Sequence, residues 1–264
     1  MSTRRAYSTD VTDDEWKLIE NVIPAPKEGG RPATHPRREL LNGMMYATKT
    51  GCQWHLLPHD FPPYKTVYHY FREWGRTGVW KAVNDHLRQQ VRLAEGRDAE
   101  PTAGIIDSQS VKTTESGGPR GYDGGKKTKG RRRHLVVDVL GMIVAVAVLS
   151  GQIQDRDGAR VVVGQVAQEN KGVTHIWADS AYRGKLLHWA KRRHNISLEI
   201  VSKKPGQVGF EVQPKRWIVE RTFGWLNRYR RLSKDYERNT DSSVAHIHVA
   251  MARVMLRRLA PVTT

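Results

Sequence analysis

The period of the hydrophobic positions changes near residue 100, which predicts two parts of different structure. Before this point, apolar residues recur at helical spacing in runs that Pro and Gly separate. Thr12 is predicted to cap a first helix, and Pro36 is predicted to open a second. Thr66 is predicted to cap a third helix, which a break at Thr77 separates from a fourth. We therefore expect residues 1–98 to form a small all-α domain with an aromatic-rich core.

The rest of the chain, residues 99–264, alternates β-branched segments with amphipathic ones. Two adjacent segments are predicted to form a β-hairpin that turns at Gly141. The order of the segments predicts an α/β domain with a mixed sheet flanked by helices. The strands are predicted over 103–111, 134–140, 142–149, 173–178 and 197–202, and the helices over 157–167, 185–193, 214–231 and 243–259.

The composition adds a strong positive charge to this picture. The 264 residues include 44 Lys and Arg against 27 Asp and Glu, a net charge of +17. Such an excess attracts polyanions, so nucleic acid is the expected partner, the alternative being a basic soluble protein without one. The single cysteine, Cys52, cannot form an internal disulfide framework and agrees with a reducing cytoplasm. Residues 1–10 lack a signal-peptide core and the longest apolar run, 135–149, is too short to span a bilayer, so no membrane association is expected.

Two apolar strands each deliver an aspartate at or near their ends. Asp107 follows 104–106, and Asp179 follows a second apolar segment 72 residues later. Neighbouring strands can hold two carboxylates so close that a cation between them is favoured, and Mg²⁺ prefers such oxygen ligands. Glu220 is the candidate third acid, on a predicted helix with Arg216 one turn before it.

Each of these acids also has an ordinary structural interpretation, as a turn or helix cap or as a solvated charge. Asp138, inside the predicted hairpin, is the strongest rival among the other carboxylates. Asp157 is predicted to cap a helix, and Asp155 is predicted to lie in a loop. His246 and His248 are not expected to bind zinc, because residues two apart on a helix face different sides.

Four stretches of the chain follow one another in a distinctive order and spacing. They read WHLLP at 54–58, continuing to Trp74, IIDSQSVK at 105–112, ADSAYRG at 178–184 and VERTFGWL at 219–226. Through these stretches nearly the whole chain resembles the insertion-sequence transposases of the DDE class, in the family numbered five. The resemblance implies a ribonuclease-H-like catalytic fold for residues 99–264. It implies an N-terminal domain, residues 1–98, that recognises the terminal inverted repeats of the element.

The resemblance also implies the chemistry. Asp107, Asp179 and Glu220 would be the catalytic acids and the ligands of two Mg²⁺ ions, or of Mn²⁺ in their place. In such a site one ion activates the attacking oxygen and the other stabilises the leaving oxygen. The implied substrates are double-stranded element ends, whose 3′-hydroxyls are joined to target DNA. A homodimer or larger assembly on DNA is implied, in the bacterial cytoplasm at the nucleoid.

One departure from related families concerns the surroundings of the last acid. Those families carry a Tyr, an Arg and a Lys around it, and of these only the Arg has a match, Arg216. Gln213 stands at the Tyr position and Asn227 at the Lys position. Two alternatives to a transposase stay open, a nuclease of the same fold that does not join ends and a DNA-binding protein with inactive acids.

Basic residues predicted to contact DNA fall into several groups. A Gly- and Lys-rich loop over 117–130, with the arginines that follow it, can track phosphates without reading bases, or can be a solvated disordered loop. The third N-terminal helix is predicted to face a major groove in a helix-turn-helix arrangement, or to serve in packing or dimerisation. The complete set is Lys65, His69, Arg72, Lys112, Lys126, Lys127, Lys129, Arg131, Arg132, Arg133, Lys203, Lys204, Arg216, Arg228, Arg230 and Arg231.

Overall fold

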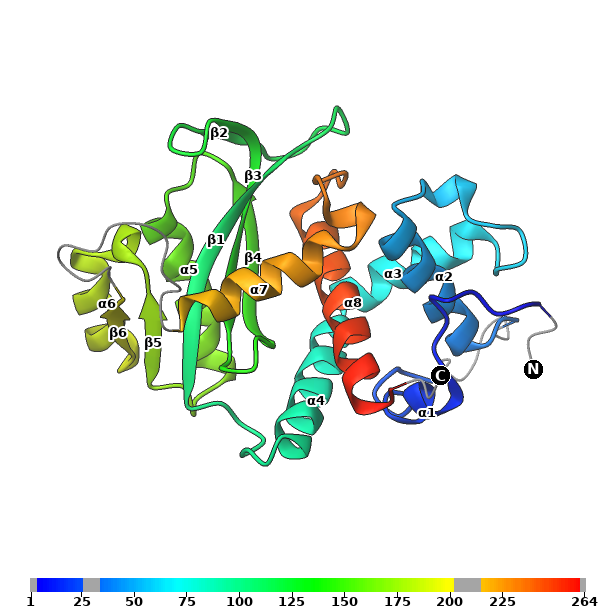
Figure 1. Ribbon diagram of the computed structural model, residues 1–264. Helices are drawn as coiled ribbons and strands as arrows, with labels where there is room; N and C mark the ends of the chain where they lie inside the picture. The colour runs from blue at the N-terminus through cyan, green and yellow to red at the C-terminus, as the bar shows by residue number, and fades with distance from the viewer. Residues whose placement is uncertain (1–3, 26–33, 202–214, 262–264) are drawn as a thin grey trace. The chain divides into compact units, whose positions relative to one another are not determined.

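The computed structural model describes residues 4–25, 34–201 and 215–261, which form two compact units (Figure 1). The helical unit contains the chain up to Glu95, Leu226–Ser233 and the chain from Asp241 onward. The sheet unit contains Gly96–Trp225 and Lys234–Thr240. This grouping differs from the predicted division at residue 98, because two segments from the C-terminal part of the chain pack with the N-terminal helices.

The helical unit is built from short amphipathic helices. Thr12 and Glu15 form a capping box at the first helix, as the sequence predicted for Thr12. The predicted cap at Thr66 is wrong, because the third helix already begins at Tyr64 and the Thr66 amide donates to the Pro63 carbonyl. The elements are α1 (Asp13–Lys17), α2 (Arg37–Thr50), η1 (Trp54–Leu56), α3 (Tyr64–Arg76), α4 (Val79–Ala94), η3 (Arg230–Leu232) and α8 (Thr240–Leu259).

Helix α8 belongs to the helical unit because its buried polar groups find their partners there. The Thr48 hydroxyl lies 2.9 Å from His246 Nδ1, and Asn84 Nδ2 donates to the His248 carbonyl at 2.9 Å. Arg253 forms a buried ion pair with Glu15 at 2.7 Å. Buried polar groups that lose such partners are costly, so these contacts hold α8 in place.

The sheet unit contains one six-stranded mixed sheet. Its strands run in the order β2-β3-β1-β5-β6, and β4 also pairs with β3. The β1–β3 and β3–β4 pairs are antiparallel, whereas β1–β5 and β5–β6 are parallel. The predicted α/β class with a ribonuclease-H-like mixed sheet is confirmed. The elements are β1 (Ala103–Lys112), β2 (Gly121–Asp123), β3 (Thr128–Val137), β4 (Ile143–Ser150), α5 (Asp155–Glu169), β5 (His175–Ala178), η2 (Ser180–Tyr182), α6 (Lys185–His194), β6 (Ser197–Ile200) and α7 (Arg216–Asn227).

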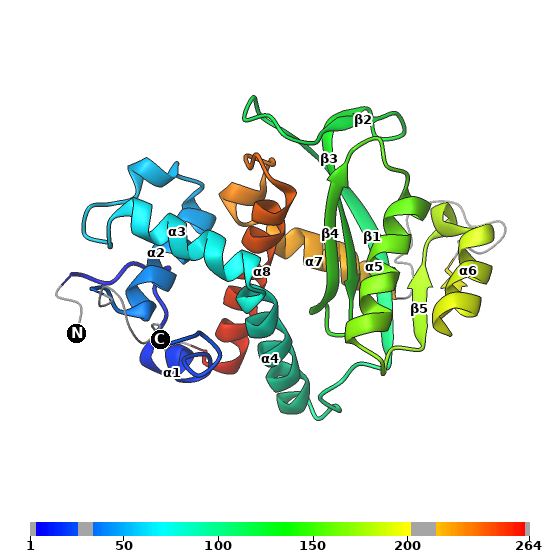
Figure 2. The same cartoon turned by 180° about the vertical axis from the view of Figure 1, so that it is seen from behind.

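Helices cover both faces of this sheet. Figure 1 shows α7 crossing one face, and Figure 2 shows α5 on the opposite face. Aliphatic side chains from α5, α6 and the strands, such as Val136, Val162 and Ile176, form the core between the helices and the sheet. The Thr222 hydroxyl of α7 donates to the Gly141 carbonyl at 2.9 Å. Within the described residues, no helix has the length and apolar character needed to cross a bilayer.

The β3–β4 turn decides the role of Asp138. Its buried carboxylate accepts hydrogen bonds from the amides of Leu140 at 2.9 Å and Met142 at 2.8 Å. Gly141 takes the positive φ of 84° that the turn requires, as its predicted position in the hairpin suggested. Asp138 is therefore a turn-forming residue, and the hypothesis that it rivals the other acids is wrong.

Three predicted element boundaries are also wrong. Strand β3 begins at Thr128, inside the segment predicted to be a loop, because β2 and β1 both pair with its first residues. Helix α5 begins at Asp155 after Gln154, so Asp157 lies within its first turn and does not cap it. Helix α7 ends at Asn227, so the predicted extension to Arg231 is replaced by a turn and η3.

Candidate active site

Asp107 and Asp179 lie side by side because of the register of two parallel strands. Strand β1 pairs with β5 so that Ile105 faces Trp177, an offset of 72 residues. Two residues further along, the same offset places Asp107 opposite Asp179, which directly follows β5. Adjacent strands lie roughly 4.8 Å apart, so the two carboxylates lie next to each other where β5 ends.

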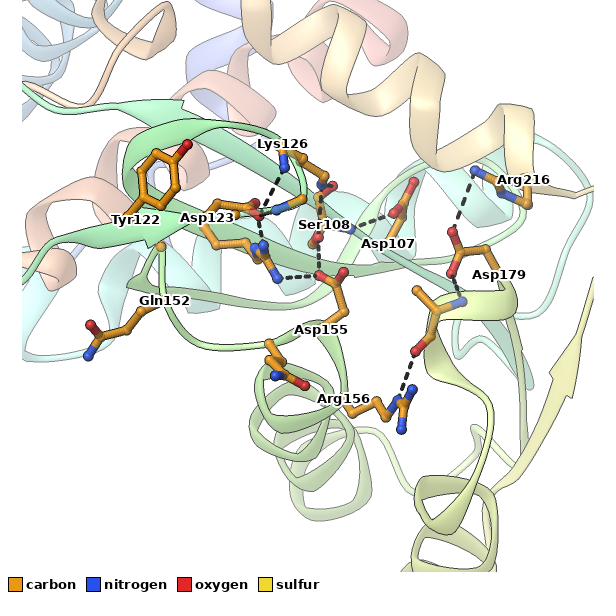
Figure 3. A pocket seen from close by; sticks show the side chains of 16 residues that line it. Asp107, Ser108, Tyr122, Asp123, Lys126, Gln152, Asp155, Arg156, Asp179 and Arg216 are labelled. Carbon is orange, nitrogen blue, oxygen red and sulfur yellow. Dashed lines mark hydrogen bonds and ion pairs between the residues drawn. The ribbon is translucent and has the colours of Figure 1, made fainter.

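Both aspartates line a cleft of about 850 Å³ in the sheet unit. Figure 3 shows their side chains at one end of the cleft, close to Arg216, with Tyr122 at the other end. The cleft is lined by four acids and four bases, namely Asp107, Asp123, Asp155, Asp179, Lys126, Arg132, Arg156 and Arg216.

The Asp107 carboxylate is electrostatically strained. Burial raises the pKa of Asp107 to about 6. The hydrogen bond from the Ser108 amide to Asp107 Oδ1, at 2.7 Å, lowers this pKa, and the negative charge of Asp179 raises it further. Asp179 accepts a hydrogen bond from the Ala181 amide at 2.9 Å, which caps η2. Two oxygen-donor groups that repel one another in this way suit a hard divalent cation.

Glu220 lies nearby but outside the cleft lining. Its side chain is 54% exposed, and its Oε1 lies 3.4 Å from Arg216 Nη2. The same Arg216 nitrogen lies 3.9 Å from Asp179 Oδ2. Arg216 therefore occupies the space between the two acids. Among the described residues, no three His, Cys, Asp or Glu side chains lie close enough together to hold a metal ion.

The residues of this site thus fit a divalent cation in part. Asp107 and Asp179 supply adjacent oxygen donors with unfavourable mutual repulsion, which is the chemistry such an ion relieves. A third carboxylate from Glu220 would need the Arg216 side chain to move, because Arg216 now contacts both Asp179 and Glu220.

A second group of acids in the cleft is neutralised internally. Arg132 forms ion pairs with both Asp123 and Asp155, the latter at 3.1 Å. The Ser108 hydroxyl donates to Asp155 at 2.5 Å, and the Ser110 hydroxyl donates to Asp123 at 2.5 Å. Burial alone would raise the pKa of Asp123, but the bonds from Ser110 and Arg132 lower it to about 2.

Sequence reasoning missed this second group. Asp155 was predicted to lie in a loop, whereas it begins α5 and faces the cleft. Asp123 lies in β2, which falls inside the segment predicted to be a loop. The available signal was the spacing of Ser108 and Ser110, two residues apart and therefore on one face of β1, since hydroxyls on one strand face need polar partners.

Lys126 reaches into the cleft from the β2–β3 turn. Asp123 Oδ1 accepts the amides of Gly125 and Lys126, each at 3.1 Å, and so fixes this turn. Lys126 Nζ then donates to the Ser108 carbonyl at 2.9 Å. The turn therefore holds an ammonium group beside Asp107, where an anionic substrate group would be attracted.

The prediction of a flexible basic loop is wrong for three of its arginines. Arg131, Arg132 and Arg133 lie in β3 and are buried. Arg131 pairs with Asp235 at 3.0 Å, and Arg133 donates to Gln109 and to the Lys234 carbonyl. Their cationic groups hold the sheet unit together, so they do not offer the exposed surface that tracking phosphates requires.

The other basic residues of the sheet unit are mostly exposed. Lys112, Lys126, Lys127 and Lys129 have exposed side chains, and Arg216 is partly buried. Lys203, Lys204 and Gln213 lie outside the described residues.

In the helical unit, one of the basic residues predicted to contact DNA is buried and the others are exposed. Arg231 is buried, donates to the Cys52 carbonyl at 2.8 Å and lies over the Trp54 ring, so the prediction that it extends an exposed basic helix is wrong. Arg228 and Arg230 are exposed beyond the end of α7. The α3 residues Lys65, His69 and Arg72 are all exposed.

Comparison with known protein families assigns both parts of the chain. A family model described as "Transposase DDE domain" matches residues 98–255, which is more than half of the chain. A second, described as "Putative transposase of IS4/5 family", matches residues 11–84.

Individual relatives come from insertion elements of bacteria. An uncharacterised 16.2 kDa protein of insertion element IS402 from Burkholderia cepacia is 31% identical over 40% of this chain and 76% of its own length. A putative transposase for IS402 from the same species is 26% identical over 52% of this chain and 66% of its own length. A putative transposase for IS6501 from Brucella ovis is 26% identical over 47% of this chain and 96% of its own length.

Proposed function

Because the chain belongs to the DDE transposase family, we propose that it cleaves the DNA ends of a mobile element and joins their 3′-hydroxyls to target DNA. The observation that carries this proposal is the position of Asp107 opposite Asp179 at the end of a cleft. The paired carboxylates suit Mg²⁺, and the net charge of +17 suits a DNA substrate.

In this proposal Asp107, Asp179 and Glu220 hold two Mg²⁺ ions. When bound, these ions supply Lewis-acid stabilisation of the attacking and leaving oxygens of an in-line phosphoryl displacement. Arg216 binds a phosphate oxygen of the DNA, which withdraws its guanidinium from Asp179 and Glu220 and frees both carboxylates. Lys126 lies beside Asp107 and orients the phosphate, while Asp123 and Arg132 keep its turn in place.

The helical unit supplies recognition of the terminal inverted repeats in this proposal. Lys65, His69 and Arg72 are exposed at positions four and three residues apart on α3, and therefore lie along one side of the helix. A helix with a polar, basic side of this kind can enter a major groove. The partners are thus double-stranded element ends, target DNA and a second copy of the chain that holds the other end, in the bacterial cytoplasm at the nucleoid.

A cleavage assay tests the proposal. Labelled duplexes from the DNA that flanks the coding sequence are incubated with the full chain and Mg²⁺. We expect strand cuts that leave a 3′-hydroxyl, followed by joined products. Asp107→Asn or Asp179→Asn should reduce both by roughly a thousand-fold or more. Asp157→Asn is the matched control, because Asp157 is an exposed acid in α5 outside the cleft lining.

Two outcomes would contradict the proposal. Asp107→Asn and Asp179→Asn variants with native rates would show that these acids are not catalytic. Cutting without any joined product would instead favour a nuclease of the same fold.

A further inference from the structure

A second hollow lies beside the cleft and has a different character. It has a volume of about 450 Å³ and is formed by the end of β1, the residues after it and the β2–β3 hairpin. We call it the basic groove. It is lined by Lys112, Thr113, Thr114, Glu115, Arg120, Tyr122, Lys127 and Lys129.

The charges of the basic groove favour an anionic ligand. Four of its residues are cations with exposed side chains, Lys112, Arg120, Lys127 and Lys129, and one is an acid, Glu115. These cations contrast with Arg131, Arg132 and Arg133 of the same sheet, whose charges are buried and engaged with protein groups. Exposed, weakly engaged cations are free to neutralise phosphates.

Tyr122 gives the groove an aromatic surface as well. Its side chain is 58% exposed, although a large aromatic ring in a sheet normally packs against neighbours. It pairs across β2 and β3 with Lys129, so the ring and the ammonium group lie side by side on one face. An exposed ring between cations is the arrangement on which the bases of single strands stack while their phosphates are neutralised.

Tyr122 also joins the groove to the cleft, since it lines both. Figure 3 places it at the end of the cleft away from Asp179 and Arg216. A strand that leaves the carboxylates along the cleft therefore reaches Tyr122 at the far end, where the basic groove with its four cations begins. Bases inside a duplex are already stacked on one another, so a Tyr ring can receive a base only from an unpaired region.

We propose that the basic groove binds single-stranded DNA that continues from the cleaved position, with an unpaired base stacked on Tyr122. The proposal rests on the proposed function only in taking DNA as the substrate. It adds a site for an unpaired strand to a chain whose other expected contacts are to duplex DNA.

The test measures binding of the full chain without metal by fluorescence anisotropy. The probes are a labelled thymidine oligonucleotide and a blunt labelled duplex of unrelated sequence. Tyr122→Ala should weaken binding of the single strand by roughly ten-fold, and Tyr122→Trp should retain it. The proposal is supported if Tyr122→Ala lowers the affinity for the single strand by a factor at least three times larger than the factor for the duplex. Any smaller difference overturns it.

The cations are tested by the salt dependence of the same binding. Lys129→Ala should lower the slope of log affinity against log salt for the single strand by about 0.7. Lys171→Ala, an exposed lysine between α5 and β5, is the control and should leave the slope unchanged. Equal slopes for the Lys129 variant and the control would contradict the binding of phosphates in the basic groove. Failure of the cleavage assay would overturn the proposed function alone, because strand binding is measured without cleavage.

Discussion

The Arg216 guanidinium lies 3.9 Å from the Asp179 carboxylate, at the end of the cleft where Asp179 and Asp107 lie on neighbouring strands. It is a cation placed where a divalent cation is proposed to bind, so we expect the two to compete. Removing this competing charge with Arg216→Ala should therefore tighten Mg²⁺ binding to the DNA-free chain by several-fold, since nearby charges interact strongly in a partly buried site. The same variant should lower DNA cleavage roughly ten- to a hundred-fold, because a phosphate-binding group is lost.

Calorimetric titration with Mg²⁺ measures the first effect. Arg156→Ala is the matched control, because Arg156 also lines the cleft but its Nε donates to the Ala181 carbonyl at 3.1 Å. If both variants tighten Mg²⁺ binding equally, the effect is one of general charge and the competition at Asp179 is absent.

Asp123 is predicted to stabilise the fold in a pH-dependent manner. Its pKa is lowered from 3.8 to about 2, so the folded state favours the ionised form more than the unfolded state does. This stabilisation is complete above pH 3.8 and is lost as the pH falls towards 2. Asp123→Asn should lower the free energy of unfolding by about 1–2 kcal/mol at pH 7, allowing for screening by solvent in the cleft.

Urea unfolding between pH 7 and pH 2 checks this prediction. The difference between the native chain and Asp123→Asn should shrink as the pH falls through that range. A difference that stays constant with pH would mean that the ionised carboxylate is not the stabilising form. Asp157→Asn again serves as the control, since an exposed helical acid should change stability by less than about 0.5 kcal/mol.

Gly158 is predicted to be required where α5 meets the sheet. A Cβ at this position would overlap the buried imidazole ring of His134 in β3. Gly158→Ala should therefore destabilise the fold by about 1–3 kcal/mol, because the helix or the buried ring must shift to relieve the overlap. Gly164, on the same helix, has no atom within 4 Å of such a Cβ. Gly164→Ala should instead stabilise the fold by roughly 0.5–1 kcal/mol.

Chemical denaturation of Gly158→Ala, of His134→Ala and of the variant that carries both changes checks the contact, and Gly164→Ala is measured beside them. The double variant should lose less stability than the sum of the two single changes, because the overlap disappears with the ring. Additive losses would show that Gly158 and His134 do not constrain one another.

The buried pair of Arg131 and Asp235 is predicted to tie Lys234–Thr240 to the sheet. Arg131 Nη1 lies 3.0 Å from Asp235 Oδ1, and both side chains are buried. Asp235→Asn removes the carboxylate charge that neutralises the buried Arg131 and should cost about 3–5 kcal/mol in unfolding free energy. Replacing both residues by Arg131→Met and Asp235→Leu should restore part of this loss. Thermal unfolding measures the effect, and a near-native single variant would contradict it.

The sequence by itself determined most of the helices and strands and singled out Asp107 and Asp179. The change of hydrophobic period separated helices from strands, and these patterns depend only on which side of each element is buried. The separation of 72 residues between Asp107 and Asp179 can be read from the chain, and the register of β1 on β5 in the structure has the same offset. The parallel pairing of the two strands, which the structure shows, then brings these carboxylates together.

Only the tertiary structure decided what happens to charges whose partners are distant in the sequence. Arg131, Arg132 and Arg133 read as an exposed basic run, but Asp235, Asp123 and Asp155 fold back to meet the first two. Placing Arg216 between Asp179 and Glu220 required the sheet and α7 together. The local sequence pattern determines on which face of a helix or strand a residue lies. Whether a charged side chain is buried depends on the opposite charge that folding brings next to it.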